Sequence, residues 1–231
     1  MQRLILFDVD GTLLRAGRQV RPIFTEALAE TFGADVPLDG VDFAGKTDPM
    51  IVTELLRRAG LDAEAARERL PTMRRSYLRR MRERLDGGAM RVLPGVVDLL
   101  RRLSARDDLV VGLLTGNWRG GADVKLERCG LGGVDGGFFV MGAFGDDADD
   151  RRGLVPVALE RGSALCGRQL DSGDALIIGD TALDVDCARH AGVACLGVAT
   201  GWTPRETLEA AGADFVFDTL EHAAREHPWL R

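Results

Sequence analysis

Residues 4–14, "LILFDVDGTLL", contain an apolar run that ends in two carboxylates, Asp8 and Asp10. The run is too short for a helix and does not alternate with polar residues, which is typical of a β-strand buried on both faces. An ordinary turn at the end of such a strand needs one aspartate. Two neighbouring carboxylates repel each other, and a divalent cation would offset that repulsion. The stretch therefore predicts a buried strand with a metal site at its carboxyl end.

Apolar runs of the same kind recur along the chain and alternate with helical patterns. The helical period is clear in "GVVDLLRRLSA" (95–105) and "VPVALERGSALC" (155–166). This alternation predicts an α/β fold with a doubly wound, Rossmann-like parallel sheet, in which ligands bind beyond the carboxyl ends of the strands. The expected strands are "LILF" (4–7), "LVVGLL" (109–114), "ALIIG" (175–179), "VACLGV" (193–198) and "DFVF" (214–217).

Residues 15–90 interrupt the alternation, because they carry helical patterns and no clear strand. One of these helices is expected to begin at Thr47 or Asp48, since either side chain can cap a helix and a proline follows. We therefore predict an inserted helical domain over residues 15–90. Residues 1–14 and 91–231 are then expected to form the α/β core domain together.

The composition is that of an ordinary globular protein, with 231 residues, 45% of them hydrophobic and 29% charged. The net charge of -6 argues against nucleic acid or an anionic membrane surface as the main partner. No apolar run has the roughly 20 residues that a membrane helix needs, and the first residues show no signal-peptide pattern. We expect a cytoplasmic protein. Four cysteines without C-x-x-C spacing and three late histidines leave carboxylates as the expected reactive groups.

Polar clusters follow three of the predicted strands, and a fourth opens a predicted helix. Taken alone, each cluster is ordinary turn or helix-cap chemistry. The carboxyl ends of parallel strands meet at one edge of a sheet, so the clusters are expected to lie together. They comprise Asp8 to Thr12, Thr115 to Asn117, Arg151 with Arg152, and Asp180 to Asp184.

These clusters resemble the four motifs of the haloacid dehalogenase (HAD) superfamily in its phosphatase branch. The matching stretches are "DVDGTL" (8–13), "TGN" (115–117), a basic residue near 151 and "GDTALD" (179–184). The helical insert is similar to the α-helical cap of that branch, so the resemblance covers nearly the whole chain. Within the superfamily the chain is most similar to the phosphoglycolate phosphatase and β-phosphoglucomutase-like group. The resemblance implies a phosphatase for a small phosphate ester, acting as a monomer or homodimer.

The resemblance also implies a role for each carboxylate. Asp8 would attack phosphorus and form an aspartyl-phosphate, while Asp10 would protonate the leaving oxygen and then deprotonate the attacking water. Mg²⁺ is the expected cofactor, because the clustered ligands are hard oxygens. Its implied ligands are the Asp8 carboxylate, the Asp10 backbone carbonyl and Asp180, with Asp184 in support.

The phosphate group is expected to meet Thr115, Gly116 and Asn117, whose hydroxyl and backbone N–H groups are ready donors. The third motif departs from the usual pattern of Lys followed by Pro, since the matching region reads "DDRRGLVP" (149–156). Arg151 is the expected cation there, because its planar fork can hold phosphate and carboxylate. Arg152 and Lys125 are the alternatives.

Three other functions stay open at this stage. A phosphomutase shares the whole set of motifs and differs in returning the phosphoryl group to a sugar. A dehalogenase on the same fold would need neither Asp10 as an acid nor Mg²⁺, and a phospho-acceptor signalling module would need neither the acid nor the cap. Specificity is also open: Lys46 in "FAGKTD" (43–48) is either a solvated loop residue or a contact for a second anionic group, such as the carboxylate of phosphoglycolate.

Overall fold

Six parallel strands form the central sheet in the computed structural model, which describes residues 2–33, 40–61 and 63–231. The strand order is β5-β4-β1-β6-β7-β8, so β1, with Asp8 at its end, lies between β4 and β6 in the middle of the sheet. The doubly wound α/β prediction is confirmed. The strands are β1 (Arg3–Phe7), β4 (Leu109–Leu114), β5 (Met141–Ala143), β6 (Ala175–Gly179), β7 (Ala194–Val198) and β8 (Phe215–Phe217).

Helices cover both faces of this sheet, which explains why its strands are apolar at nearly every position. In β1, Ile5 and Phe7 pack in one core cluster, while Leu4 and Leu6 pack in another on the opposite face. The first cluster includes α4 (Val96–Ser104), α5 (Arg119–Arg128) and α9 (Leu220–Glu226). The second includes α6 (Leu154–Cys166), α7 (Ala182–His190) and α8 (Arg205–Ala211). No described helix is long and apolar enough to cross a membrane.

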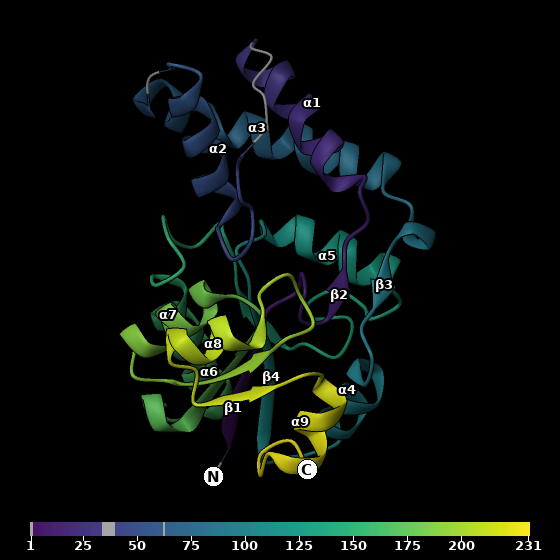
Figure 1. The fold of residues 1–231 in the computed structure, drawn as a ribbon, viewed down its shortest axis with the longest axis vertical. Helices are drawn as coiled ribbons and strands as arrows, with labels where there is room; N and C mark the ends of the chain where they lie inside the picture. Colours follow the sequence, from purple (N-terminus) through teal and green to yellow (C-terminus); the bar gives the residue numbers. More distant parts are fainter. Residues whose placement is uncertain (1, 34–39, 62) are drawn as a thin grey trace.

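Three helices follow β1 and lie beyond the carboxyl edge of the sheet, at the end of the molecule opposite both termini (Figure 1). They are α1 (Val20–Phe32), α2 (Asp48–Arg58) and α3 (Ala63–Arg84). The chain leaves the sheet through β2 (Leu14–Arg15) and returns through the short helix η1 (Gly87–Ala89) and β3 (Arg91–Val92). Strands β2 and β3 pair as a separate antiparallel ribbon, so both crossings run side by side.

An aromatic cluster joins these helices to the core. Trp118, in the loop after β4, stacks on Phe24 of α1 with ring centroids 6.3 Å apart and packs at 5.7 Å from Tyr77 of α3. All three side chains are buried. Such pairs contribute about 0.5–1.5 kcal/mol each beyond their buried area. The cluster therefore fixes where α1 and α3 sit relative to the loop that follows β4.

Candidate active site

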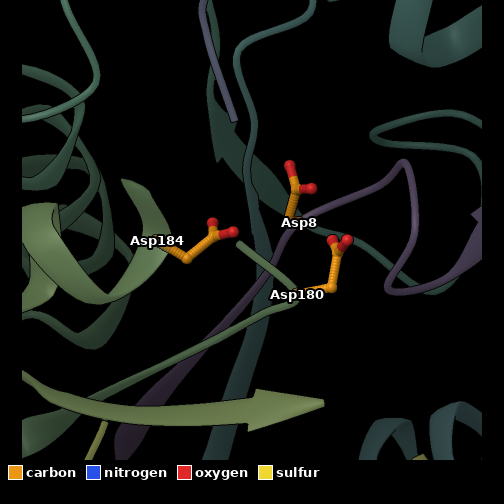
Figure 2. Close-up of side chains that lie close together, drawn as sticks. All are labelled: Asp8, Asp180 and Asp184. Carbon is orange, nitrogen blue, oxygen red and sulfur yellow. The ribbon is translucent and has the colours of Figure 1, made fainter. Parts of the chain in front are cut away.

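Three buried carboxylates converge at the carboxyl edge of the sheet (Figure 2). Asp8 follows β1, Asp180 follows β6, and Asp184 lies in the first turn of α7. One oxygen from each lies within 4.8 Å of the other two. Hard oxygen atoms at this spacing are the donor set that Mg²⁺ or another small divalent cation prefers. The residues present therefore fit a metal ion.

The electrostatics of Asp8 and Asp180 give a second reason to expect a cation. Burial raises the pKa of Asp8 from 3.8 to about 6, with further contributions from the charges of Asp184 and Asp10, against the opposing charge of Arg151. Burial, followed by the charges of Asp8 and Asp184, raises the pKa of Asp180 well above its usual range. Clustered carboxylates of this kind are stabilised in the ionised form by a bound cation.

Small residues leave the room that Asp180 occupies. A Cβ atom on Gly201 would lie 1.6 Å from Asp180 Oδ2, and one on Gly11 would lie 2.3 Å from the same oxygen. Gly11 also has a φ of +90°, which side-chain-bearing residues rarely adopt. The Thr12 hydroxyl donates to Asp180 Oδ1 at 3.1 Å. This explains the Gly-Thr pair after Asp10: the glycine makes space, and the threonine orients the carboxylate.

Arg151 is the cation placed among the carboxylates. Its guanidinium is buried, lies 3.0 Å from Asp8 Oδ1 and donates to Asp184 Oδ1. It also donates to the Leu114 carbonyl at 3.2 Å, which ties it to the end of β4. Arg152 points elsewhere, because its side chain is half exposed and pairs with Asp186. Of the two neighbouring arginines, the structure therefore brings Arg151 into the site and leaves Arg152 outside it.

Asp184 serves two partners and lies in a capping box. Its Oδ2 accepts from the backbone N–H of Thr181 at 3.0 Å and from the Thr181 hydroxyl at 2.6 Å, while Oδ1 faces Arg151. The Thr181 hydroxyl oxygen accepts in turn from the Asp184 backbone N–H. The local sequence thus builds the start of α7 and holds Asp184 toward Asp8 at the same time.

A second polar group surrounds Asp10. Its Oδ2 accepts from Asn117 Nδ2 at 2.8 Å and from Lys125 Nζ at 2.6 Å. Asn117 Nδ2 also donates to Thr115 Oγ1 at 2.8 Å. Thr115 is fully buried at the end of β4, directly before Gly116. Asp10 and the motif at residues 115–117 after β4 therefore share one hydrogen-bond network.

The loop before α2 packs directly on the site. The Asp48 backbone N–H donates to the Gly116 carbonyl at 2.7 Å, and the Gly45 carbonyl accepts from Arg151 at 3.1 Å. A Cβ on Gly116 would lie 2.1 Å from the Lys46 carbonyl oxygen, so this approach requires glycine. The Lys46 side chain points to Glu54 of α2 and forms an ion pair at 2.5 Å.

Two residues of the site make contacts that differ from those expected from the sequence. Asp48 was expected to serve as a possible helix cap, yet its carboxylate accepts from the Trp118 backbone N–H at 2.8 Å, while the Thr47 side chain caps α2. Lys125, an alternative for the third-motif cation, instead contacts Asp10 and Asn117. The sequence carries no local signal for either contact, because both depend on how α2 and α5 pack against the loop after β4.

Comparisons with known sequences and structures find relatives of this chain. A family model described as haloacid dehalogenase-like hydrolase matches residues 5–189. A curated relative from Synechococcus elongatus, named phosphoglycolate phosphatase, is 31% identical over 217 residues, covering 93% of this chain and 92% of the relative. Among solved structures, one described as a predicted phosphatase from Clostridium acetobutylicum aligns with a TM-score of 0.70 at 20% identity, covering 96% of both chains. CbbY from Rhodobacter sphaeroides in complex with phosphate aligns with a TM-score of 0.65 at 20% identity, also covering 96% of both chains.

Proposed function

This chain belongs to the haloacid dehalogenase-like hydrolase family and is a phosphatase, and we propose that it hydrolyses small phosphate monoesters through an aspartyl-phosphate on Asp8. One observation carries the proposal. A buried carboxylate at the end of the central strand lies beside a buried arginine and two further acids, while a separate carboxylate stands two residues away. Phosphoryl transfer needs a nucleophile, charge compensation and a distinct acid, and this arrangement supplies all three.

The chemistry divides between Asp8 and Asp10. A carboxylate oxygen of Asp8 attacks phosphorus, the bond from phosphorus to the leaving oxygen breaks, and Asp10 gives its proton to that oxygen. Water then attacks phosphorus and transfers a proton to Asp10, and the bond between Asp8 and phosphorus breaks to release inorganic phosphate. Asp10 suits this exchange because its side chain is more than a third exposed, at 37%, whereas that of Asp8 is buried.

The remaining site residues compensate charge and position the phosphoryl group. We propose that Thr115 and the backbone around Gly116 and Asn117 bind phosphate oxygens, and that Arg151 stabilises the charge that develops beside Asp8. Arg151 is well suited to this task, because its contacts with Asp184 and the Leu114 carbonyl hold its guanidinium in place before substrate binds.

Mg²⁺ is the proposed cofactor. Asp8, Asp180 and the Asp10 backbone carbonyl would hold it, with Asp184 in support. When bound, the ion would neutralise charge on the phosphate oxygens and on the nucleophile. The proposal is supported by the glycines around Asp180 and the hydroxyl of Thr12, which hold that carboxylate close to Asp8 and Asp184.

We further propose that residues 15–90 act as a cap over residues 1–14 and 91–231, and that they select the substrate. Support comes from the placement of α1, α2 and α3 over the carboxyl edge of the sheet (Figure 1). The loop before α2 reaches Gly116 and Arg151, so a bound ester would meet cap residues on its leaving-group side. The likeness to the Synechococcus phosphoglycolate phosphatase favours a small ester with a second anionic group, such as phosphoglycolate.

The setting of this activity is also part of the proposal. A net charge of -6 and four free cysteines fit a cytoplasmic enzyme of small metabolites, present as a monomer or homodimer, better than a nucleic-acid- or membrane-binding protein.

Turnover of p-nitrophenyl phosphate and of phosphoglycolate with Mg²⁺ tests the function. We expect release of inorganic phosphate from both and its loss in Asp8→Asn, whose near-isosteric amide cannot attack. Conversion of a sugar phosphate into an isomer, without phosphate release, would indicate a β-phosphoglucomutase-like phosphomutase. Release of halide from a haloacid without Mg²⁺ would indicate a haloacid dehalogenase.

A further inference from the structure

Lysine is rare in this chain. Of its 30 Lys and Arg residues, Lys46 and Lys125 are the two lysines. Lys125 lies on α5 and is 3% exposed. Burying an ammonium group is costly unless it is paired and hydrogen-bonded. A chain that uses arginine almost everywhere thus keeps a compact point charge at a buried position beside Asp10, where a planar guanidinium would need more room.

The contacts of Lys125 are confined to the site. Its ammonium donates to Asp10 Oδ2 and to Asn117 Oδ1, both at 2.6 Å. Asn117 Nδ2 donates to the same Asp10 oxygen at 2.8 Å. The three side chains therefore form a closed triangle, with the ammonium and the amide both directed at Asp10.

The Lys125 ammonium also fixes the orientation of the Asn117 side-chain amide. An ammonium can only donate and an ionised carboxylate can only accept. Asn117 must therefore turn its oxygen to Lys125 and its nitrogen to Asp10 and Thr115. An apolar side chain at position 125 would remove the donor that fixes this orientation of the amide. Asp10 would then lose its bond from Lys125, and its bond from Asn117 would no longer be held in place.

The arrangement distinguishes the two oxygens of Asp10. Oδ2 accepts from two donors, whereas Oδ1 accepts from none of the described residues. Oδ1 is therefore the oxygen left to exchange a proton with a leaving group or a water molecule. Lys125 itself is buried beneath Asp10 and reaches the reaction through it.

We propose that Lys125 is a positioning residue which, together with Asn117, clamps Oδ2 of Asp10 and directs Oδ1 toward the scissile bond. The inference rests on the proposed function and deepens it, because it assigns the orientation of the Asp10 carboxylate to a residue outside the four motifs. Arg151 and Lys125 then have separate tasks: Arg151 serves the nucleophile, and Lys125 serves the acid.

A double-mutant cycle with Asp10 tests this assignment. Lys125→Met keeps the length of the side chain and removes its donors. We expect kcat for an alkyl phosphate to fall about 10- to 100-fold, the size of effect that follows from misplacing a catalytic group by about 1 Å, with KM nearly unchanged. In an Asp10→Asn background the same change should cost almost nothing, because Lys125 acts through Asp10.

Two further variants make the cycle specific. Lys125→Gln retains amide donors and should recover part of the loss seen in Lys125→Met, and it serves as the test if the methionine variant fails to fold. Arg128→Met, which removes a positive charge from the exposed side of α5, should leave kcat unchanged. Equal losses from Lys125→Met with and without Asp10, or a loss confined to KM, would overturn the proposal.

A crystal structure of Lys125→Met tests this inference independently of the proposed function. The Asp10 carboxylate should leave its position beside Asn117 in that variant and keep it in Asp8→Asn. An unmoved Asp10 would overturn the positioning role whatever the activity. Absence of phosphate ester turnover by the wild-type protein would instead overturn the proposed function and leave this structural test standing.

Discussion

The Trp118 backbone N–H donates to the Asp48 carboxylate at 2.8 Å and so connects the first turn of α2 with the loop after β4. The Asp48 N–H returns a bond to the Gly116 carbonyl at 2.7 Å. Asp48 is buried, and burial is the main reason that its pKa rises from 3.8 to about 7, with the charge of Lys125 opposing the rise. The contact between the helical segment and the site thus includes an acid that folding favours in its protonated form.

This acid makes stability depend on pH. Because the folded-state pKa of Asp48 is raised, its contribution is fully present below the unfolded pKa, near 3.8, and is lost as the pH rises through about 7. Asp48→Asn cannot titrate, so the free energy of unfolding of the variant should improve relative to wild type between about pH 5 and about pH 8. Urea unfolding of both proteins at the two pH values measures the difference. A difference that does not change with pH would show that Asp48 titrates normally.

Removal of the metal should abolish turnover. We expect activity to disappear in EDTA and to return with Mg²⁺, while Ca²⁺ should inhibit, since its larger and more flexible shell misplaces the nucleophile. Asp180→Ala should resemble the chelated enzyme, because it removes one of the three converging carboxylates. Arg152→Ala is the matched control, since that side chain pairs with Asp186 outside the site. Full activity after chelation would refute the metal requirement.

The effect of removing the acid on the rate of hydrolysis should depend on the leaving group. Asp10→Asn is expected to slow hydrolysis of alkyl phosphates by about 100-fold or more, the range of general acid catalysis. Hydrolysis of p-nitrophenyl phosphate should suffer less in its first step, because p-nitrophenolate leaves without protonation. Comparison of kcat/KM for the two ester classes measures this contrast. Equal losses in both classes would remove Asp10 from the role of acid.

Lys46 is expected to matter for the local structure more than for specificity. Its ion pair with Glu54 occupies its charge, and both side chains are 22% exposed. Lys46→Ala should lower the free energy of unfolding by less than about 1 kcal/mol, as is usual for pairs with access to solvent. The ratio of KM values for phosphoglycolate and a neutral phosphate ester should stay unchanged. A selective rise in KM for phosphoglycolate would instead make Lys46 a contact for a second anionic group.

The fold was largely predictable because its strands are buried on both faces. The runs at 4–7, 109–114 and 175–179 match the apolar extent of β1, β4 and β6, with Arg3 added at the start of β1. Strand β5 was missed, since "MGA" is too short to carry a period. The two-residue ribbon of β2 and β3 was missed for the same reason, and its pairing joins segments far apart in the sequence.

Within the candidate site, the placement of a residue was predictable where its motif has a fixed local geometry. Asp8, Asp180 and Asp184 lie at a strand end or in the first helical turn, so their convergence follows from the sheet. The contacts of Asp48 and Lys125 could not be predicted, because they depend on how the helical segment and α5 pack against the loop after β4. Tertiary contacts of that kind leave no local pattern in the sequence.

Trapping of the covalent intermediate tests the central claim most directly. Rapid acid quenching during turnover, followed by peptide mass spectrometry, should find one added phosphoryl group on the peptide that contains Asp8. Borohydride should convert the modified residue to homoserine, as expected for an acyl phosphate, and Asp8→Asn should show neither product. Phosphate release by wild-type protein with no adduct on Asp8, or with the adduct on another residue, would contradict the account.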